Sequence, residues 1–266
     1  MKRIILSVLL VFHLAIGDTL ILSKGKYSTY VQEEEFMLAE GENIVGPVTL
    51  LPNALVDAVD IFADNVTVKS IIYDRVYQNW KENLLGKHIT VEGEGRIIKG
   101  VVISIEGKFI TLNTKKGYVV TTIPKFPSRI SSHLKWEELF SPQLTLKVNS
   151  PEAMSQTFRI RYPVDGFKWE VYYTLSINNG VKQLKGFIKI TNNTSVNLKN
   201  VTIQIDGLKN KKFVDISISP FSVKKVTFIK KKVMNLQQIK GLINGKVYIY
   251  KNGIFIKTVN LRNLSI

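Results

Sequence analysis

Hydrophobic and polar residues alternate along most of the chain with a period of two, which is typical of half-buried β-strands. In Phe158–Tyr162, for example, three apolar residues alternate with two arginines. The pattern predicts an all-β protein with less than about 15 % helix. Further runs of the same kind are Phe187–Ile190, Val201–Ile205 and Val247–Tyr250. Because glycine adopts positive φ readily, tight turns are expected at Gly166, Gly180, Gly207, Gly245 and Gly253.

The spacing of these runs predicts three β-regions behind a short leader. Two short stretches, Asp74–Leu85 and Leu134–Phe140, carry weak helical patterns and are expected to be connectors. Continuous strand is expected over Val56–Ile72. The expected parts, in chain order, are a leader at 1–17, an N-terminal β region at 18–78, a small SH3-like β-barrel at 79–131, a linker at 132–142 and an immunoglobulin-like β-sandwich at 143–266.

Residues 1–17 have the layout of a secretory signal peptide. Two basic residues precede the nearly unbroken apolar run Ile4–Leu14, and small residues, Ala15 and Gly17, occupy the positions that a signal peptidase reads. The run is shorter than the roughly 20 residues that span a bilayer. We therefore expect cleavage before Asp18 and a periplasmic or secreted protein with no membrane span after cleavage. An uncleaved anchor and a buried first strand are the alternatives.

Charge is distributed very unevenly along the chain. The whole sequence has a net charge of +16. Residues 18–80 carry ten acids and four bases, a net of −6, whereas residues 171–266 carry two acids and seventeen bases, a net of +15. A basic half of this kind suits an anionic polymer or an anionic lipid surface. The alternative is a bias of composition, since lysines outnumber arginines 30 to 7.

Three lysine clusters in the basic half are the candidate polyanion-binding residues. Clustered lysines can follow the charges of a phosphate-bearing polymer, although lysine-rich edge strands also occur without a ligand. The members are Lys211, Lys212, Lys224, Lys225, Lys230, Lys231 and Lys232.

Two segments resemble the C-terminal domain of the mucoidy-inhibitor-A-like proteins. The first is Tyr162–Leu175, continued by Gly186–Thr194 and Leu198–Ile203, and the second is Leu242–Gly253. The opening of the expected barrel, with Leu85-Gly86-Lys87, is similar to that family's layout. The chain departs from the longer members because it has no coiled-coil insertion. The resemblance implies the fold and a secreted or envelope-associated location, and it implies no catalytic residues.

The sequence offers little to enzyme chemistry. There is no cysteine, which excludes disulfides and thiolate sites, and no nucleophile elbow, phosphate loop, dinucleotide motif or zinc-protease motif. His133 and Glu137 would share a helix face but lack a third metal ligand, and His88 is expected on a strand surface. Trp169 is expected in the sandwich core, on one strand face with Val171. We therefore expect no enzymatic activity and no cofactor.

These patterns predict an exported, non-enzymatic β-protein of the cell envelope with a binding or assembly role. Its partner would be another envelope protein or an anionic envelope polymer, and nucleic acid is not expected. A protein that binds polyanions or anionic lipids through the lysine clusters is the first alternative. A hydrolase with an unrecognised carboxylate site is the second.

Overall fold

The computed structural model describes residues 17–73, 80–134, 139–208, 212–234, 239 and 241–264. The protein is all-β, with 65 % strand and, among these residues, no helix of seven or more residues, which confirms the predicted fold class. No helix in the described part of the chain is long and apolar enough to cross a membrane. The expected leader lies, apart from Gly17, outside the described residues.

The chain folds as two compact units, and each draws on more than one stretch of sequence. Unit 1 contains the described residues up to Phe36, the segment Leu55–Phe62 and the residues from Thr157 onward. Unit 2 contains Met37–Ala54 and Ala63–Gln156. This differs from the predicted division, because strands expected together in residues 18–78 are shared between sheets that belong to different units.

One sheet of unit 1 has six strands in the order β16-β15-β1-β2-β12-β4. Its first strand in sequence, β1, is an interior strand that pairs in parallel with β15 and antiparallel with β2. Alternate residues along β12 are buried, and Phe158, Ile160 and Tyr162 are fully inaccessible. The strands are β1 (Thr19–Leu22), β2 (Ser28–Leu38), β4 (Asp60–Phe62), β12 (Met154–Val164), β15 (Leu198–Ile205) and β16 (Lys212–Ile218).

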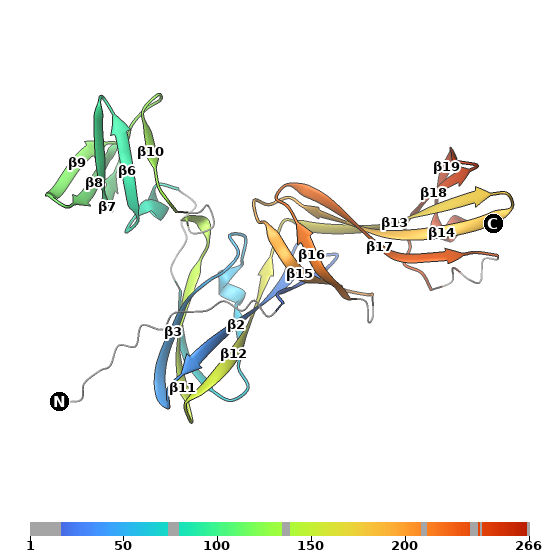
Figure 1. Cartoon of the computed structure of the whole chain (residues 1–266), viewed down its shortest axis with the longest axis horizontal. Coiled ribbons are helices and arrows are strands. Elements are labelled where there is room, and N and C mark those ends of the chain that lie inside the picture. The colour runs from blue at the N-terminus through green and yellow to red at the C-terminus, as the bar shows by residue number, and fades with distance from the viewer. Residues whose placement is uncertain are drawn as a thin grey trace. The chain divides into compact units, whose positions relative to one another are not determined.

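The second sheet of unit 1, here called the C-terminal sheet, has the order β17-β14-β13-β18-β19 (Figure 1). Its long central strands β13 and β14 pair over their full length. One face is apolar and buried, with Val171, Tyr173 and Leu175 on β13. The strands are β13 (Phe167–Asn178), β14 (Val181–Asn192), β17 (Ser222–Lys232), β18 (Lys246–Lys251) and β19 (Ile254–Asn260), followed by the 3-10 helix η4 (Leu261–Asn263).

Unit 2 contains a five-stranded meander in the order β10-β6-β7-β8-β9, at the position where the sequence predicts a small barrel. Its core includes Ile89, Val102 and Ile110. The predicted closure is wrong, since the sheet stays open: in the described part of the chain β9 pairs only with β8, and β10 only with β6. The strands are β6 (His88–Gly93), β7 (Arg96–Glu106), β8 (Phe109–Thr114), β9 (Gly117–Thr122) and β10 (Arg129–Ser131).

A three-stranded sheet, β3-β11-β5, completes unit 2. Its strands are β3 (Gly41–Thr49), β5 (Thr67–Tyr73) and β11 (Gln143–Ser150). The strand expected over Val56–Ile72 is in fact broken into a 3-10 helix, η1 (Val56–Ala58), and strands β4 and β5. A second 3-10 turn, η2 (Glu82–Leu84), lies within the expected connector Asp74–Leu85, of which residues 74–79 lie outside the described part.

Four of the five predicted glycine turns are confirmed by positive φ, at Gly166, Gly180, Gly207 and Gly253. Gly245, the fifth, does not have positive φ, and glycine is required there because two backbones approach closely. A Cβ atom at this position would lie 2.4 Å from the carbonyl oxygen of Val171. Only glycine allows β18 to begin this close to β13, which brings the side chains of both strands to one surface.

Candidate functional site

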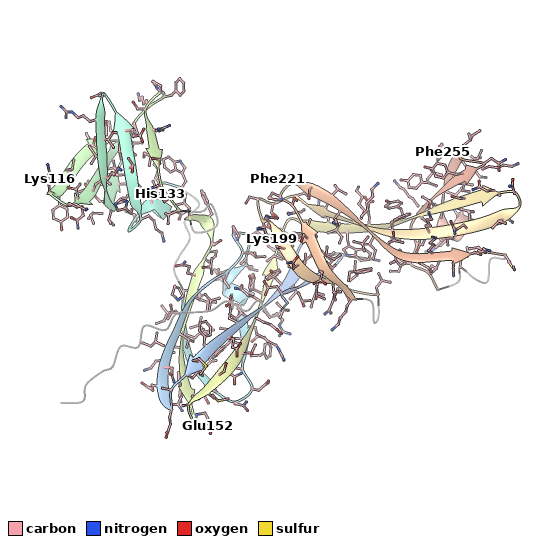
Figure 2. The ribbon with its side chains drawn as sticks, viewed as in Figure 1. Lys116, His133, Glu152, Lys199, Phe221 and Phe255 are labelled. Atoms are coloured by element: carbon pink, nitrogen blue, oxygen red, sulfur yellow. The ribbon has the colours of Figure 1, made fainter. Side chains whose placement is uncertain are left out.

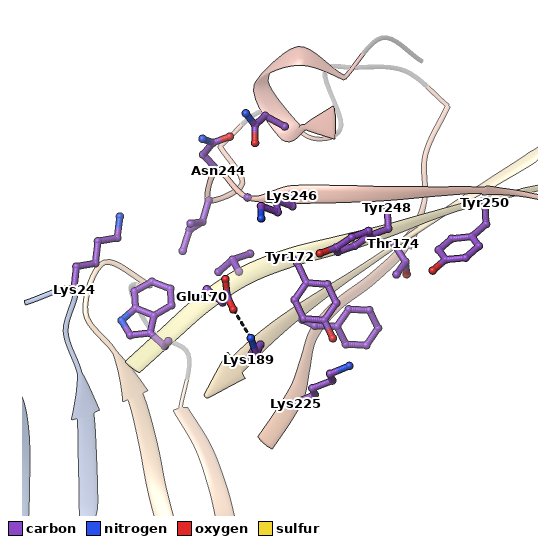
Figure 3. Close-up of a pocket in the computed structure, with 16 residues that line it drawn as sticks. Lys24, Glu170, Tyr172, Thr174, Lys189, Lys225, Asn244, Lys246, Tyr248 and Tyr250 are labelled. Carbon is purple, nitrogen blue, oxygen red and sulfur yellow. Dashed lines mark hydrogen bonds and ion pairs between the residues drawn. The ribbon is translucent and has the colours of Figure 1, made fainter. Parts of the chain in front are cut away.

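A trough with a volume of about 870 Å³ lies on the outer face of the C-terminal sheet. Four lysines and five aromatic residues line it, together with a single carboxylate, that of Glu170 (Figure 3). The charged and aromatic members are Lys24, Lys189, Lys225 and Lys246, and Trp169, Tyr172, Phe187, Tyr248 and Tyr250. The volume is in the range of ligand-binding clefts in proteins.

Strand periodicity explains why these side chains share one surface. Successive side chains of a strand point to opposite faces, and residues that pair across strands point to the same face. Tyr172 pairs with Phe187 on β14 and with Lys246 on β18. Tyr248 and Tyr250 follow Lys246 at intervals of two residues along β18. The buried residues between them form the core, so the trough is the polar half of one alternating pattern.

The outer face also places lysine directly opposite lysine. Lys225 of β17 pairs with Lys189 of β14, and Lys230 of β17 pairs with Lys185 of β14. Like charges directly opposite each other on one sheet face destabilise the pairing of the strands. For Lys185 and Lys230, no ion pair relieves this repulsion within the described residues.

Glu170 relieves the other lysine pair in part. The Nζ atom of Lys189 donates to Oε1 of Glu170 at 2.6 Å, from directly opposite positions on β14 and β13. This hydrogen bond raises the pKa of the Lys189 ammonium. Both groups are solvent-exposed, so the pair contributes little to stability. Figure 3 shows the two side chains facing each other beside Tyr172.

The aromatic side chains pack against one another. The rings of Tyr172 and Phe187 are stacked, with centroids 5.1 Å apart and an angle of 18°. Tyr248 meets Tyr172 edge to face at 5.8 Å, and the Nζ atom of Lys225 lies 5.6 Å from the centre of the Tyr172 ring. Phe255, labelled in Figure 2, contacts Tyr250 edge to face and extends the aromatic row onto β19. The rings thus form a rigid floor, because each one restricts its neighbours.

Trp169 differs from the expectation of a core residue. It is half-buried, in contrast to the buried Val171 two positions on, and it lines the trough. Its indole N–H donates to the carbonyl oxygen of Ser23 at 3.0 Å, and the Nζ atom of Lys24 lies 6.0 Å from its ring centre. Trp169 therefore fastens the turn between β1 and β2 to the end of the trough and brings Lys24 there.

The structure divides the predicted lysines among different surfaces. Lys225 lines the trough, and Lys230 and Lys232 share its face through their pairing with β14. Lys224 and Lys231 pair with Ile190 and Leu184, which belong to the opposite face. Lys212 begins β16 in the six-stranded sheet, and Lys211 lies outside the described residues. Lysines that are neighbours in the sequence of β17 thus point to opposite faces of the sheet, and Lys212 lies on another sheet.

Of the four lysines that line the trough, only Lys225 is among the candidates that the sequence suggests. Lys185, Lys189 and Lys246 were not among the candidates because they occur singly, each between apolar residues. The sequence does contain a signal for them, namely their position in the alternating pattern. Each of these lysines lies two residues from an aromatic residue of the same strand, so both side chains point to the same face. Searching for clusters in sequence favoured neighbours such as Lys224 and Lys225, which a strand sends to opposite faces.

The remaining candidates do not assemble into a site in the described part of the chain. His88 and His133 are both exposed, and Glu137, the suggested partner of His133, lies outside the described residues. Within the described ranges, no group of three or more His, Cys, Asp or Glu residues is placed to hold a metal ion.

Comparison of the chain with protein-family models, with curated proteins and with solved structures finds no match. The resemblance to the mucoidy-inhibitor-A-like proteins therefore stays a prediction from the sequence. The function has to be argued from the trough.

Proposed function

We propose that this is an exported, non-enzymatic binding protein of the cell envelope, and that the outer face of its C-terminal sheet binds an anionic polymer. The leader-like sequence supports export, and the trough supports binding. Lysines on β14, β17 and β18 supply the positive charge, and the aromatic floor supplies a fixed surface against which a chain of ligand units can lie.

The observation that carries the proposal is the placement of lysine opposite lysine. Lys185 faces Lys230 and Lys189 faces Lys225 across the same two strands. Each arrangement costs stability, on the order of a few tenths of a kcal/mol, when nothing binds there. An anionic polymer lying along β14 and β17 would turn both repulsive pairs into favourable contacts. The feature that is unfavourable in the free protein is thus the feature that a polyanion would use.

Binding to a polyanion should depend strongly on salt, because each lysine contact releases counterions from the polymer. The test is a titration of the purified protein with inorganic polyphosphate at two ionic strengths. Lys225→Gln/Lys230→Gln should weaken binding about tenfold or more at low salt and reduce the salt dependence.

The matched control removes the same number of charges from other surfaces. Lys212→Gln/Lys224→Gln changes one exposed lysine of β16 and one lysine of β17 that pairs toward the buried face. This variant should bind nearly as well as the wild-type protein. Equal losses in the two variants would mean that net charge, not the trough, governs binding, and would overturn the proposal.

A further inference from the structure

A carboxylate is the one group in the trough that a site for negative charge alone does not need. Glu170 repels an anionic ligand and also occupies the ammonium group of Lys189. Its side chain is 59 % exposed. Among the described residues, no group donates a hydrogen bond to its second oxygen, Oε2. Glu170 therefore offers a charged hydrogen-bond acceptor to whatever lies in the trough.

The neutral polar side chains that line the trough can also accept hydrogen bonds from a ligand. Three tyrosines, Tyr172, Tyr248 and Tyr250, and the amide side chains of Asn244 and Asn260 line the same trough. A tyrosine hydroxyl donates and accepts, and so does an amide, whereas lysine only donates. A ligand with only acceptor oxygens can use the donors of these side chains but not their acceptors. A ligand that also carries hydroxyl groups can use both the donors and the acceptors.

The arrangement of the rings argues against bases as the stacking units. Binding of single-stranded nucleic acid relies on aromatic faces that are open to successive bases. Here Phe187 stacks on Tyr172, and Lys225 lies over the same ring. Part of the ring faces is therefore covered by neighbouring side chains. The ring edges and the tyrosine hydroxyl groups are the parts that can contact a ligand.

We infer that the ligand of the trough is an acidic glycan, a sugar polymer that carries carboxylate, sulfate or phosphate groups. Its anionic groups pair with Lys225 in the trough and with Lys185 and Lys230 on the same face of the sheet, and its hydroxyl groups donate to Glu170. This inference rests on the proposed polyanion-binding function and narrows it. Glu170 is then the residue that distinguishes a hydroxylated polyanion from a bare one.

The test compares three probes of similar charge: polygalacturonate, inorganic polyphosphate and an oligothymidylate. Each is titrated against the wild-type protein, Glu170→Gln and Glu170→Met. For polygalacturonate, affinity should fall in the order wild type, Gln, Met, by about three- to tenfold in total, because a hydrogen bond to a charged acceptor is lost. For polyphosphate, both variants should bind more tightly than the wild type, because a repulsive charge is removed.

The control is Glu42→Gln. Glu42 also pairs with a lysine of the neighbouring strand, Lys147 at 3.1 Å, but in the three-stranded sheet of unit 2. Its removal should leave all three affinities unchanged. Unfolding midpoints of all variants verify that folding is intact.

The outcomes separate this inference from the broader proposal. If Glu170→Gln tightens binding of all three probes, the site recognises charge alone, and the acidic-glycan inference fails while polyanion binding stands. Tightest binding of the oligothymidylate would also overturn the inference. If the wild-type protein binds none of the probes at low salt, the proposed function fails as well.

Discussion

The two sheets of unit 1 differ in how charges pair across their strands, although the C-terminal sheet also has one opposite-charge pair, Glu170 with Lys189. On the six-stranded sheet, the arginines of β12 each meet an acid on a neighbouring strand: Arg159 pairs with Glu33 at 3.2 Å and Arg161 with Asp60 at 2.6 Å. On the C-terminal sheet, lysines of β17 meet lysines of β14. Both faces are solvent-exposed and both alternate with a buried apolar face, so exposure and strand geometry do not account for the difference.

The comparison indicates what each surface is for. Opposite charges across strands keep a surface soluble and favour the correct pairing at little cost. Like charges across strands do neither, and the sheet holds together because its other face is well packed. A face that retains such repulsion is therefore a better candidate for a ligand site than a face that is equally charged but internally balanced.

The largest expected effect on stability comes from disturbing the contact between β13 and β18, the strands that carry part of the trough. Gly245→Ala places a Cβ atom against the carbonyl oxygen of Val171, so β18 must shift away from β13. We expect a loss of about 1–3 kcal/mol in the free energy of unfolding, as for overpacked sites. Chemical denaturation measures this loss. The neighbouring Asn244→Ala, which creates no such clash, should change stability by less than about 0.5 kcal/mol.

A second variant converts the C-terminal sheet to the pattern of the six-stranded sheet. Lys230→Glu places a carboxylate opposite Lys185, as Asp60 stands opposite Arg161. Polyanion affinity should fall roughly tenfold or more at low salt, about 1.4 kcal/mol, while stability stays equal or rises slightly. Titration and denaturation of the same sample give both values. Unchanged affinity would show that this lysine pair is not part of the binding surface.

The buried face of β13 should respond to alkaline pH through Tyr173. Burial raises the pKa of the Tyr173 hydroxyl to about 12, and this hydroxyl donates to the carbonyl oxygen of Ile243 at 2.7 Å. Because the folded-state pKa lies above the unfolded value of 10, the native state holds this proton more tightly. Its contribution to stability is complete below pH 10 and is lost as the pH rises toward 12, by at most about 1.4 kcal/mol per pH unit.

Tyr173→Phe removes this alkaline loss and costs about 1 kcal/mol at neutral pH, where the hydrogen bond is missing. Urea denaturation of the wild-type protein and of Tyr173→Phe between pH 7 and 11 measures this difference. The assignment of Tyr173 is contradicted if both proteins have the same alkaline profile.

The smallest expected effect is that two charge-removing variants, one on each sheet, change the free energy of unfolding in opposite directions. Lys185→Gln should stabilise the protein by a few tenths of a kcal/mol, because it removes a repulsive pair. Asp60→Asn should destabilise it by a similar amount, because it removes an attractive one. Both are exposed or half-exposed positions, so denaturation at low salt, where screening is weakest, is the appropriate measurement. A salt titration should bring the two values together.

Which features of the fold and of the trough could be predicted from the sequence depends on how far apart in the chain the interacting residues lie. Alternation along a strand is local, so the β-content, the meander and most glycine turns could be predicted from the sequence. Pairing between distant strands is not local, so the parallel contact of β1 with β15 and the break at Val56–Ala58 were not foreseen. The trough required both kinds of information: local phase places Lys189 and Tyr172 on outer faces, but only the register between strands places them together.

The position of β1 also has a consequence for the order of events in folding. This strand, at the beginning of the described chain, is hydrogen-bonded between β2 and β15, and Thr19 pairs with Thr202. Its place in the sheet does not exist until most of the polypeptide has been synthesised. Such long-range pairing slows folding, since a large loop must close before any contact rewards it. A chain that has to pass a translocation channel unfolded would gain time from this delay, because unit 1 has no complete sheet to form until its last third emerges.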